Sequence, residues 1–516
     1  MQTIVRTPRM LILLVFLSGM TTMSVEMAGA RLLDPYFGNS LIVWASLIGL
    51  IMIYLSAGYF IGGRLADRWP RASILYQIIL WAAFAVGLIP FVARPILRLA
   101  AIGMAGYQPG LLAGALLAVL ALFSIPIFLL GCVSPFAIRL VMHEVNSAGH
   151  TSGRLYALST MGSIVGTFLP VLLLIPNIGT RATFFLTSAW LFFPALAGLL
   201  QETGRRAWAY LLLPATLAGL ILWQNRGPIK PAEGLVYEFE SAYNYIQIVD
   251  AEGTICLKLN EGEGIHSVYN PTETMTFALW DYFLMVPYFN NPPFGPERVR
   301  SLCMIGLAAG TVPKLYTIAY GPIPIDGAEI DPAIIEVGRR YFAMNEPNLS
   351  VYAEDGRRFL TRSSKQYDVI AIDAYRPPYI PFHLTTREFF EEARRRLTPD
   401  GVVAINVART ASDDRLVDAL SATMASVFPN VHRIDEPLSG YELGNSLVVA
   451  TNQSTRLENF AANLPLLAGN RLLSEIGRRT APLVAPAQTT GPVFTDDRAP
   501  VEQVMHQLIL RYLLGG

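Results

Sequence analysis

The sequence predicts two parts of different fold class: a transmembrane bundle of helices over residues 1–225, and an α/β domain over residues 234–516. Residues 226–233 link them. The first part contains several hydrophobic runs whose length is close to the ~20 residues that a helix needs to cross a bilayer. The apolar spacing then changes to alternating strands and strand–helix repeats. The first 225 residues carry 13 Lys and Arg against five Asp and Glu, while the remainder carries 26 bases and 34 acids, so the overall net charge of zero hides a division. The net charge therefore gives no argument about nucleic acid, and we expect no nucleic-acid partner.

We expect seven membrane-spanning helices. Residues 93–107, which contain Arg94 and Arg98, are typical of an interfacial helix instead, and the count becomes eight if they cross as well. Glu26, and the further hydrophobic segments behind the first, argue against a cleaved signal peptide. The approximate spans are Met10–Ala30, Leu41–Ile61, Ile74–Phe91, Leu111–Gly131, Tyr156–Ile175, Ala182–Leu200 and Tyr210–Trp223.

Arginines between the spans indicate an orientation. Most of them fall on one side, which the positive-inside rule assigns to the cytoplasm. Seven spans from a cytoplasmic N-terminus would then place the α/β domain outside the cell. The arginines on this side are Arg6, Arg9, Arg64, Arg68, Arg71, Arg139, Arg154, Arg205 and Arg206.

Glu26 is the acidic residue within a predicted span that requires an explanation. An ionisable group in a span is costly and therefore a functional candidate. The alternative is an anchor near the membrane interface, close to Arg31.

The second part begins with hairpin strands at residues 234–249 and 254–259. Strands are then predicted at residues 301–306, 327–330, 349–353, 367–373 and 401–407, each followed by a helix, at residues 311–319, 332–342, 357–362, 386–397 and 413–427. Two more strands are expected at residues 431–434 and 446–450, and a partly ordered tail segment at residues 463–492. Repeated strand–helix units imply a mostly parallel sheet covered on both faces, with ligands at the carboxyl ends of the strands.

Candidate binding residues follow four of these strands. Gly306 and Gly310 end the first and let the backbone approach a ligand before a helix begins. Glu329 ends the second, where a carboxylate can accept hydrogen bonds from ribose hydroxyls. Asp355, before Gly356, ends the third, and Asp373 ends the fourth. Together they predict a nucleoside site.

Metal chemistry is not indicated. Cys132, Cys256 and Cys303 are far apart and form no CxxC pair. No group of His, Cys or carboxylates has the spacing of metal ligands, so we expect no metal cofactor.

Residues from about 235 to 450 resemble the spermidine synthase family of aminopropyltransferases. The motifs that carry this resemblance are Glu240–Ile246, Leu259–Gly262, His266–Ser267 and the strand-end acids. With the helical bundle in front, the chain resembles bacterial membrane-fused spermidine synthase-like proteins, in which segments like Ile380–Thr386 and Thr495–Pro500 recur. The resemblance implies a Rossmann-like fold, that of class I S-adenosylmethionine-dependent methyltransferases.

The resemblance also implies roles for individual residues. Asn244 stands where a nucleoside-contacting glutamine is usual, and His266 lies near another usual glutamine. Glu329 matches the ribose-binding acid and Asp355–Gly356 the adenine-binding pair. Asp373 matches the aspartate proposed to deprotonate the attacking amine.

Three positions depart from the family pattern. The aspartate of the glycine loop is replaced by Ala308 or Ala309, the second strand-four aspartate by Arg376, and a Tyr-His-Glu segment by residues 279–281. A diamine carries two positive charges, so an arginine in place of an acid disfavours a putrescine-type acceptor.

Three functions therefore stay open. The first is aminopropyl transfer from decarboxylated S-adenosylmethionine to an amine, with release of 5'-methylthioadenosine. The second is a lyase that splits S-adenosylmethionine into methylthioadenosine and homoserine lactone, with Arg376 beside the substrate carboxylate and Tyr243 and Tyr375 as walls against the sulfonium. The third is a non-catalytic nucleoside sensor or transporter.

The expected partners are the lipid bilayer and a small nucleoside substrate, and the sequence leaves self-association open. We expect a multi-pass protein of the inner (plasma) membrane whose catalytic domain faces the cytoplasm.

Overall fold

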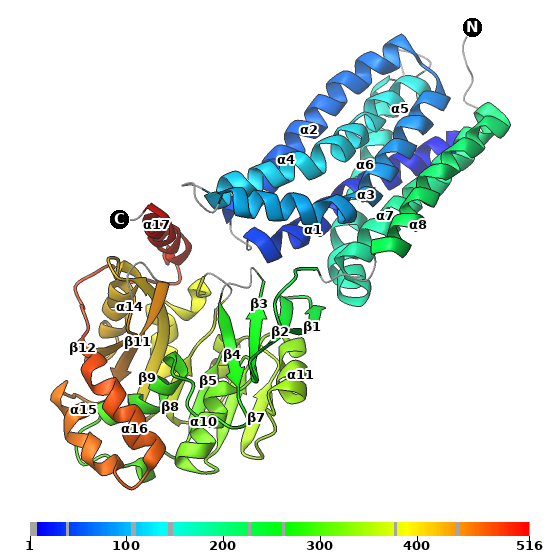
Figure 1. The fold of residues 1–516 in the computed structure, drawn as a ribbon. Coiled ribbons are helices and arrows are strands. Elements are labelled where there is room, and N and C mark those ends of the chain that lie inside the picture. The colour runs from blue at the N-terminus through cyan, green and yellow to red at the C-terminus, as the bar shows by residue number, and fades with distance from the viewer. Residues whose placement is uncertain are drawn as a thin grey trace. The chain divides into compact units, whose positions relative to one another are not determined.

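The computed structural model describes residues 8–37, 41–104, 110–142, 148–224, 229–260, 264–375, 379–438 and 443–514. The chain divides into two compact units, shown in Figure 1. The first is Met1–Pro231 with Glu238–Tyr245, and the second is Ala232–Tyr237 with Ile246–Gly516.

The first unit is helical. A π-helical turn, η2 (Pro170–Leu174), joins α6 to α7, and a 3-10 helix, η3 (Gly204–Leu211), precedes α8. Five of the predicted spans lie within one long helix each, the span at residues 156–175 covers part of α6, η2 and the first residue of α7, and the span at residues 210–223 covers the end of η3 and most of α8. The helices are α1 (Pro8–Phe37), α2 (Leu41–Arg68), α3 (Ala72–Met104), α4 (Gly110–Gly131), α5 (Val133–Val141), α6 (Ala148–Leu169), α7 (Ile175–Thr203) and α8 (Leu212–Gln224).

Residues 93–104, the described part of the interfacial helix expected at residues 93–107, continue α3, which contains Pro90 and Pro95. Their position relative to the membrane stays a prediction. Each proline removes one backbone hydrogen bond, and the rest of a 33-residue helix tolerates that loss when neighbouring helices pack around it.

Five segments of the described chain are long and apolar enough to cross a membrane: Arg9–Phe37, Val43–Arg68, Ala72–Leu97, Gly114–Val141 and Ala148–Trp223. The last covers the final three predicted spans, because α6, α7 and α8 follow one another with only η2 and η3 between them. The number of membrane crossings therefore stays a prediction.

Large apolar side chains cover the outside of this unit. Met52, Phe60 and Leu172 are more than half exposed, and Leu222 is 84% exposed. A water-soluble bundle hides its apolar stripe inside, whereas a bundle surrounded by lipid is apolar on the outside as well.

The second unit opens with a four-stranded sheet in the order β1-β2-β3-β4, in which β2-β3 and β3-β4 pair antiparallel. Its strands are β1 (Leu235–Glu240), which straddles the two units, β2 (Tyr245–Ala251), β3 (Thr254–Leu259) and β4 (Ile265–Tyr269). The predicted hairpin strands are confirmed. The short helix α9 (Leu279–Tyr282) and the 3-10 helices η4 (Phe283–Phe289) and η5 (Pro296–Arg298) lead into the larger sheet.

The larger sheet has eight strands in the order β12-β10-β11-β9-β8-β5-β6-β7. Strands β5 to β9 pair in parallel, and β9-β11, β11-β10 and β10-β12 pair antiparallel. The strands are β5 (Leu302–Ile305), β6 (Ile325–Ala328), β7 (Leu349–Tyr352), β8 (Tyr367–Ile372), β9 (Leu397–Thr410), β10 (Asn430–Asp435), β11 (Leu443–Thr451) and β12 (Val484–Pro486).

Helices alternate with the parallel strands as predicted: α10 (Thr311–Tyr320), α11 (Pro332–Tyr341), α12 (Gly356–Arg362), α13 (Arg387–Arg395) and α14 (Arg415–Ala425). Strand order reverses between β5 and β8, because β6 and β7 extend the sheet on one side of β5 and β8 and β9 on the other. In open α/β sheets this is where ligands bind.

The expectation of a partly ordered tail at residues 463–492 is wrong. This region holds η7 (Leu464–Leu467), α16 (Arg471–Thr480), η8 (Ala481–Leu483) and the edge strand β12. Buried Leu473 and Ile476 join α16 to the apolar core on one face of the sheet. The Ala- and Pro-rich composition of residues 463–492 gave no indication of these contacts. Helices α15 (Glu458–Asn463) and α17 (Val501–Leu514) lie before and after this region.

Candidate active site

The glycine loop after β5 is the centre of the candidate site. Gly306 and Gly310 have positive φ angles of 81° and 89°, which glycine adopts without strain. A Cβ atom at Gly306 would lie 2.4 Å from the carbonyl oxygen of Asp373. The loops after β5 and β8 therefore touch, and only glycine fits between them.

Glu329 follows β6 and binds this loop directly. Its carboxylate accepts the Ala308 N–H at 2.9 Å and the Asp331 N–H at 3.0 Å. Burial raises the pKa of Glu329 to about 7. A carboxylate offers about four acceptor positions, so Glu329 keeps capacity for a ligand hydroxyl.

Asp355 follows β7 and caps α12. One oxygen accepts the Arg358 N–H at 3.0 Å, and the other lies 2.9 Å from His383 Nε2. The hydrogen bond with His383 lowers the pKa of Asp355. Next to it, a Cβ atom at Gly356 would lie 2.2 Å from Ile305 Cγ2, so the first turn of α12 packs closely against the end of β5.

Asp373 follows β8 and accepts two side-chain hydrogen bonds. Asn406 Nδ2 donates to one oxygen at 2.8 Å and Trp280 Nε1 to the other at 3.2 Å. Burial raises the pKa of Asp373, and these two bonds oppose the shift. The hydroxyl of Tyr375 donates to the Asn406 carbonyl at 3.2 Å, which places this predicted wall residue beside the same strand, β9.

Trp280 and Asn406 were not predicted as site residues. In the sequence, Trp280 is distinguished only as part of the segment 279–281, which departs from the family pattern. The position of Asn406 in the sequence could have indicated a site residue, since it lies near the end of the predicted strand that follows Asp373 in the chain. Its significance depends on β8 and β9 being neighbours in the sheet.

Strand β4 packs on the glycine loop. Ser267 Oγ accepts the Ala309 N–H at 3.0 Å, and Thr311 Oγ1 donates to the Val268 carbonyl at 2.9 Å. His266 precedes this contact. Its Nε2 is buried and has no hydrogen-bond partner among the described residues, and burial lowers the pKa of His266 to about 4. The neutral imidazole is therefore the form at neutral pH.

Three predicted site residues are not tested by the structure. Tyr243 and Asn244 belong to the segment Glu238–Tyr245 of the first unit, and Arg376 lies outside the described residues. Their participation stays a prediction.

The two family-like segments at residues 380–386 and 495–500 share a structural role. Arg357 on α12 pairs with Asp496 at 2.7 Å and with Glu392 at 2.9 Å. Thr386 Oγ1 donates to Asp496 at 2.7 Å. These bonds join both segments to the helix that Asp355 caps. Within the described ranges, no three His, Cys, Asp or Glu side chains gather as metal ligands would.

Comparison with known proteins identifies the family. Residues 321–454 match the spermine/spermidine synthase domain. The polyamine aminopropyltransferase of Vibrio vulnificus is 30% identical over 224 residues, which are 42% of this chain and 71% of that protein. The chain belongs to the polyamine aminopropyltransferase family.

Two further similarities accompany this assignment. A probable polyamine aminopropyl transferase of Bifidobacterium longum is 29% identical over 313 residues, 57% of this chain, and the match spans 65% of that protein's length. A probable spermidine synthase of Corynebacterium glutamicum aligns in structure at 18% identity with a TM-score of 0.40, over 52% of this chain and 97% of that one.

Proposed function

We propose that this chain is an enzyme that binds S-adenosylmethionine or its decarboxylated form and transfers the aminopropyl group to an amine. One observation carries the proposal. In a member of the aminopropyltransferase family, Glu329, Asp355 and Asp373 end three parallel strands around one glycine loop. The carboxyl ends of parallel strands form one edge of the sheet, where a nucleoside binds.

The binding roles follow from the acceptors at this edge. Glu329 accepts hydrogen bonds from the ribose hydroxyls, and Asp355 accepts one from the adenine amino group. The glycine loop between them lets the backbone approach the ligand. The buried, neutral His266 next to the loop adds a polar contact without adding positive charge.

The chemistry requires a base beside the sulfonium. The amine attacks the methylene carbon attached to sulfur, a C–N bond forms as the C–S bond breaks, and the electron pair stays on sulfur in neutral methylthioadenosine. Asp373 takes the proton that the amine loses. Its raised pKa makes it a stronger base than an exposed aspartate, and Trp280 and Asn406 fix its orientation.

The lyase is the second candidate, and the glycine loop favours it. Neither Ala308 nor Ala309 supplies a carboxylate for the aminopropyl ammonium. Ala309 is 1% exposed in an apolar cluster, and Ala308 packs against the same cluster with a left-handed φ of 47°. Whichever of the two stands at the aspartate position, the loop offers the aminopropyl ammonium no counter-charge. In the lyase the substrate's own carboxylate attacks the same carbon, and homoserine lactone and methylthioadenosine leave without net proton transfer.

A product assay separates these functions. Purified full-length protein is incubated with S-adenosylmethionine alone, with decarboxylated S-adenosylmethionine, and with the latter plus putrescine, and methylthioadenosine is measured. Release that needs an amine supports the transferase, and release from S-adenosylmethionine alone supports the lyase. No release from any mixture would contradict both and leave the nucleoside sensor or transporter.

Asp373→Asn is the matched variant for this assay. Asparagine keeps the size of the side chain and one acceptor but cannot take a proton, so we expect methylthioadenosine release to fall by about 10²-fold or more while nucleoside binding persists. Asp400→Asn, near the amino-terminal end of β9 and away from Asn406, is the control.

The five long apolar segments support a multi-pass protein of the inner membrane. We place the α/β domain in the cytoplasm, because a permanently charged sulfonium does not cross a bilayer unaided. The arginine distribution favours the opposite orientation, and the labelling experiment in the Discussion decides between the two.

A further inference from the structure

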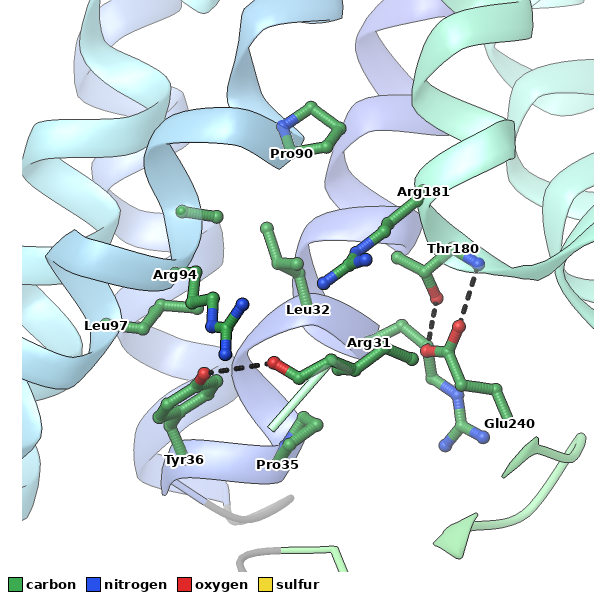
Figure 2. Close-up of a pocket in the computed structure, with 12 residues that line it drawn as sticks. Arg31, Leu32, Pro35, Tyr36, Pro90, Arg94, Leu97, Thr180, Arg181 and Glu240 are labelled. Atoms are coloured by element: carbon green, nitrogen blue, oxygen red, sulfur yellow. Dashed lines mark hydrogen bonds between the residues drawn. The ribbon is translucent and has the colours of Figure 1, made fainter. Parts of the chain in front are cut away.

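A pocket opens in the first unit between the C-terminal turns of α1, the proline-containing part of α3 and the start of α7 (Figure 2). Its walls are partly apolar, with Leu32, Pro90 and Leu97 among the lining residues. Three arginines also line it, Arg31, Arg94 and Arg181, together with one acid, Glu240. Such a concentration of guanidinium groups in an apolar bundle requires a counter-charge.

The three arginines differ in their surroundings. Arg31 is held by the Asp34 carboxylate at 3.2 Å and by the Tyr243 carbonyl at 3.2 Å, and it also bonds the Ser241 carbonyl. Figure 2 shows Arg94 and Arg181 pointing into the pocket from opposite sides. The Nε atom of Arg94 is buried and has no hydrogen-bond partner in the described part of the chain. A buried donor without an acceptor is costly, so Arg94 is suited to a ligand.

Glu240 does not neutralise the pocket. Its carboxylate accepts the Thr180 N–H at 3.0 Å and the Thr180 hydroxyl at 2.8 Å, at the start of the regular part of α7 that follows Gly179. Asp34 offsets the charge of Arg31, and Arg181 makes an interaction of its own. The formal charges of Arg94, Arg181 and Glu240 still sum to one positive charge. The electrostatic balance therefore favours an anion.

We propose that Arg94 and Arg181 bind a phosphate group in this pocket. Guanidinium groups donate paired, parallel hydrogen bonds to phosphate oxygens, and two of them facing each other match the several oxygens of one phosphate. Arg94 lies in the last turn of the apolar segment Ala72–Leu97, and Arg31 in the last two turns of Arg9–Phe37. If these segments cross the membrane as proposed above, the pocket lies at the depth of lipid headgroups, where basic pockets between helices bind anionic lipids.

Two kinds of molecule carry such a phosphate group, an anionic phospholipid and free inorganic phosphate. The test is thermal unfolding of the full-length protein in detergent, titrated with phosphatidylglycerol, with phosphatidylcholine or with inorganic phosphate. We expect phosphatidylglycerol to raise the midpoint and phosphatidylcholine to leave it unchanged. A rise with inorganic phosphate that needs Arg94 and Arg181 would assign the site to the free anion instead.

The double variant R94Q/R181Q should lose this response, with affinity weakened by about tenfold or more. R205Q/R206Q, which removes two exposed arginines from η3, is the charge-matched control and should respond like the unmodified protein. Equal responses in both double variants, or no response to either phosphate source, would overturn the proposal.

A second double variant covers the case in which R94Q/R181Q does not fold. R94K/R181K keeps both charges but loses the planar, forked donors, so binding of phosphatidylglycerol should weaken while the fold persists. Unchanged affinity in this variant would also contradict the proposal. Failure of the nucleoside chemistry would not affect this result, because the readout is lipid binding and not catalysis.

Discussion

At the scale of single residues, Glu329 connects the fold to pH. Burial raises its pKa to about 7, so between about pH 4.5 and 7 the folded protein holds a proton that the unfolded chain has released. This residue's contribution to stability therefore falls as pH rises through that window. The affinity for a nucleoside should instead rise with pH over this window. The reason is that Glu329, which accepts the ribose hydroxyls, is fully ionised only above it.

We therefore expect the affinity for methylthioadenosine to rise by up to about tenfold between pH 6 and pH 8. Calorimetry near pH 6.5 in two buffers of different ionisation enthalpy should also show proton release on binding. Glu329→Gln should bind more weakly and lose the pH dependence, whereas Glu336→Gln, an exposed acid on α11, should behave like the unmodified protein. Equal affinity at both pH values would contradict the ribose role of Glu329.

Asp355 permits a substitution that separates binding from stability. Asparagine caps a helix almost as well as aspartate but loses the part-exposed charge pair with His383, so Asp355→Asn should lower the free energy of unfolding by no more than about 1 kcal/mol. Replacing the second oxygen by an amide group removes the acceptor for the adenine amino group, and affinity should fall roughly tenfold.

The measurement is calorimetric titration with methylthioadenosine beside a denaturant melt, with Asp400→Asn as control. Unchanged affinity in Asp355→Asn would show that the adenine lies elsewhere. A large loss of stability would instead show that the bond to His383 is structural.

At the scale of elements, packing of α1 on α6 depends on small residues. A Cβ atom at Gly162 would lie 2.0 Å from the Phe16 carbonyl oxygen, and one at Gly166 would lie 2.1 Å from that of Met20. Ser24 Oγ donates to the Gly166 carbonyl at 3.2 Å across the same interface. The four-residue spacing of the two glycines is the pattern by which membrane helices approach closely.

Gly166→Ala should force these helices apart and lower the stability in detergent by about 1–3 kcal/mol. Gly153→Ala lies on the same helix with open space around it, and should instead stabilise by up to about 1 kcal/mol, because alanine favours the helix. Thermal unfolding of both variants tests this contrast, and similar midpoints would show that the close approach of α1 and α6 contributes little.

At the scale of the whole molecule, the apolar exterior of the first unit predicts firm membrane integration. The protein should remain in the membrane pellet after alkaline carbonate washing, which removes proteins bound only at the surface. Recovery in the supernatant would contradict the membrane-spanning assignment of all five apolar segments.

The side of the membrane on which the α/β domain lies can be tested, because the structure of the first unit shows at which end of the bundle the chain leaves it. Ile229, just after α8, lines the same pocket as Arg31 near the end of α1 and Thr180 at the start of α7. The chain therefore leaves the bundle at this end, opposite to Arg206, which follows α7. Arg206 and the α/β domain should lie on opposite sides of the membrane.

The cysteines Cys132, Cys256 and Cys303 are buried, so an introduced cysteine can be labelled selectively with an impermeant maleimide. In intact spheroplasts we expect labelling of Arg206→Cys, and labelling of Glu336→Cys only after lysis. Labelling of Glu336→Cys in intact spheroplasts would place the catalytic domain outside and support the orientation that the arginine distribution favours.

The sequence by itself determined the division into an apolar bundle and an α/β domain, the order of strands and helices, and the acids at the strand ends. These properties follow from composition and periodicity, which are local. Strand ends such as Asp373 could be named because the carboxyl ends of parallel strands must share one edge.

Only the tertiary structure decided which groups face those acids. The indole of Trp280, 93 residues before Asp373, donates to it, and His383 occupies one oxygen of Asp355. The arginine pocket likewise joins α1, α3 and α7. Such pairings depend on how segments far apart in the chain pack together, and neither periodicity nor spacing contains that information.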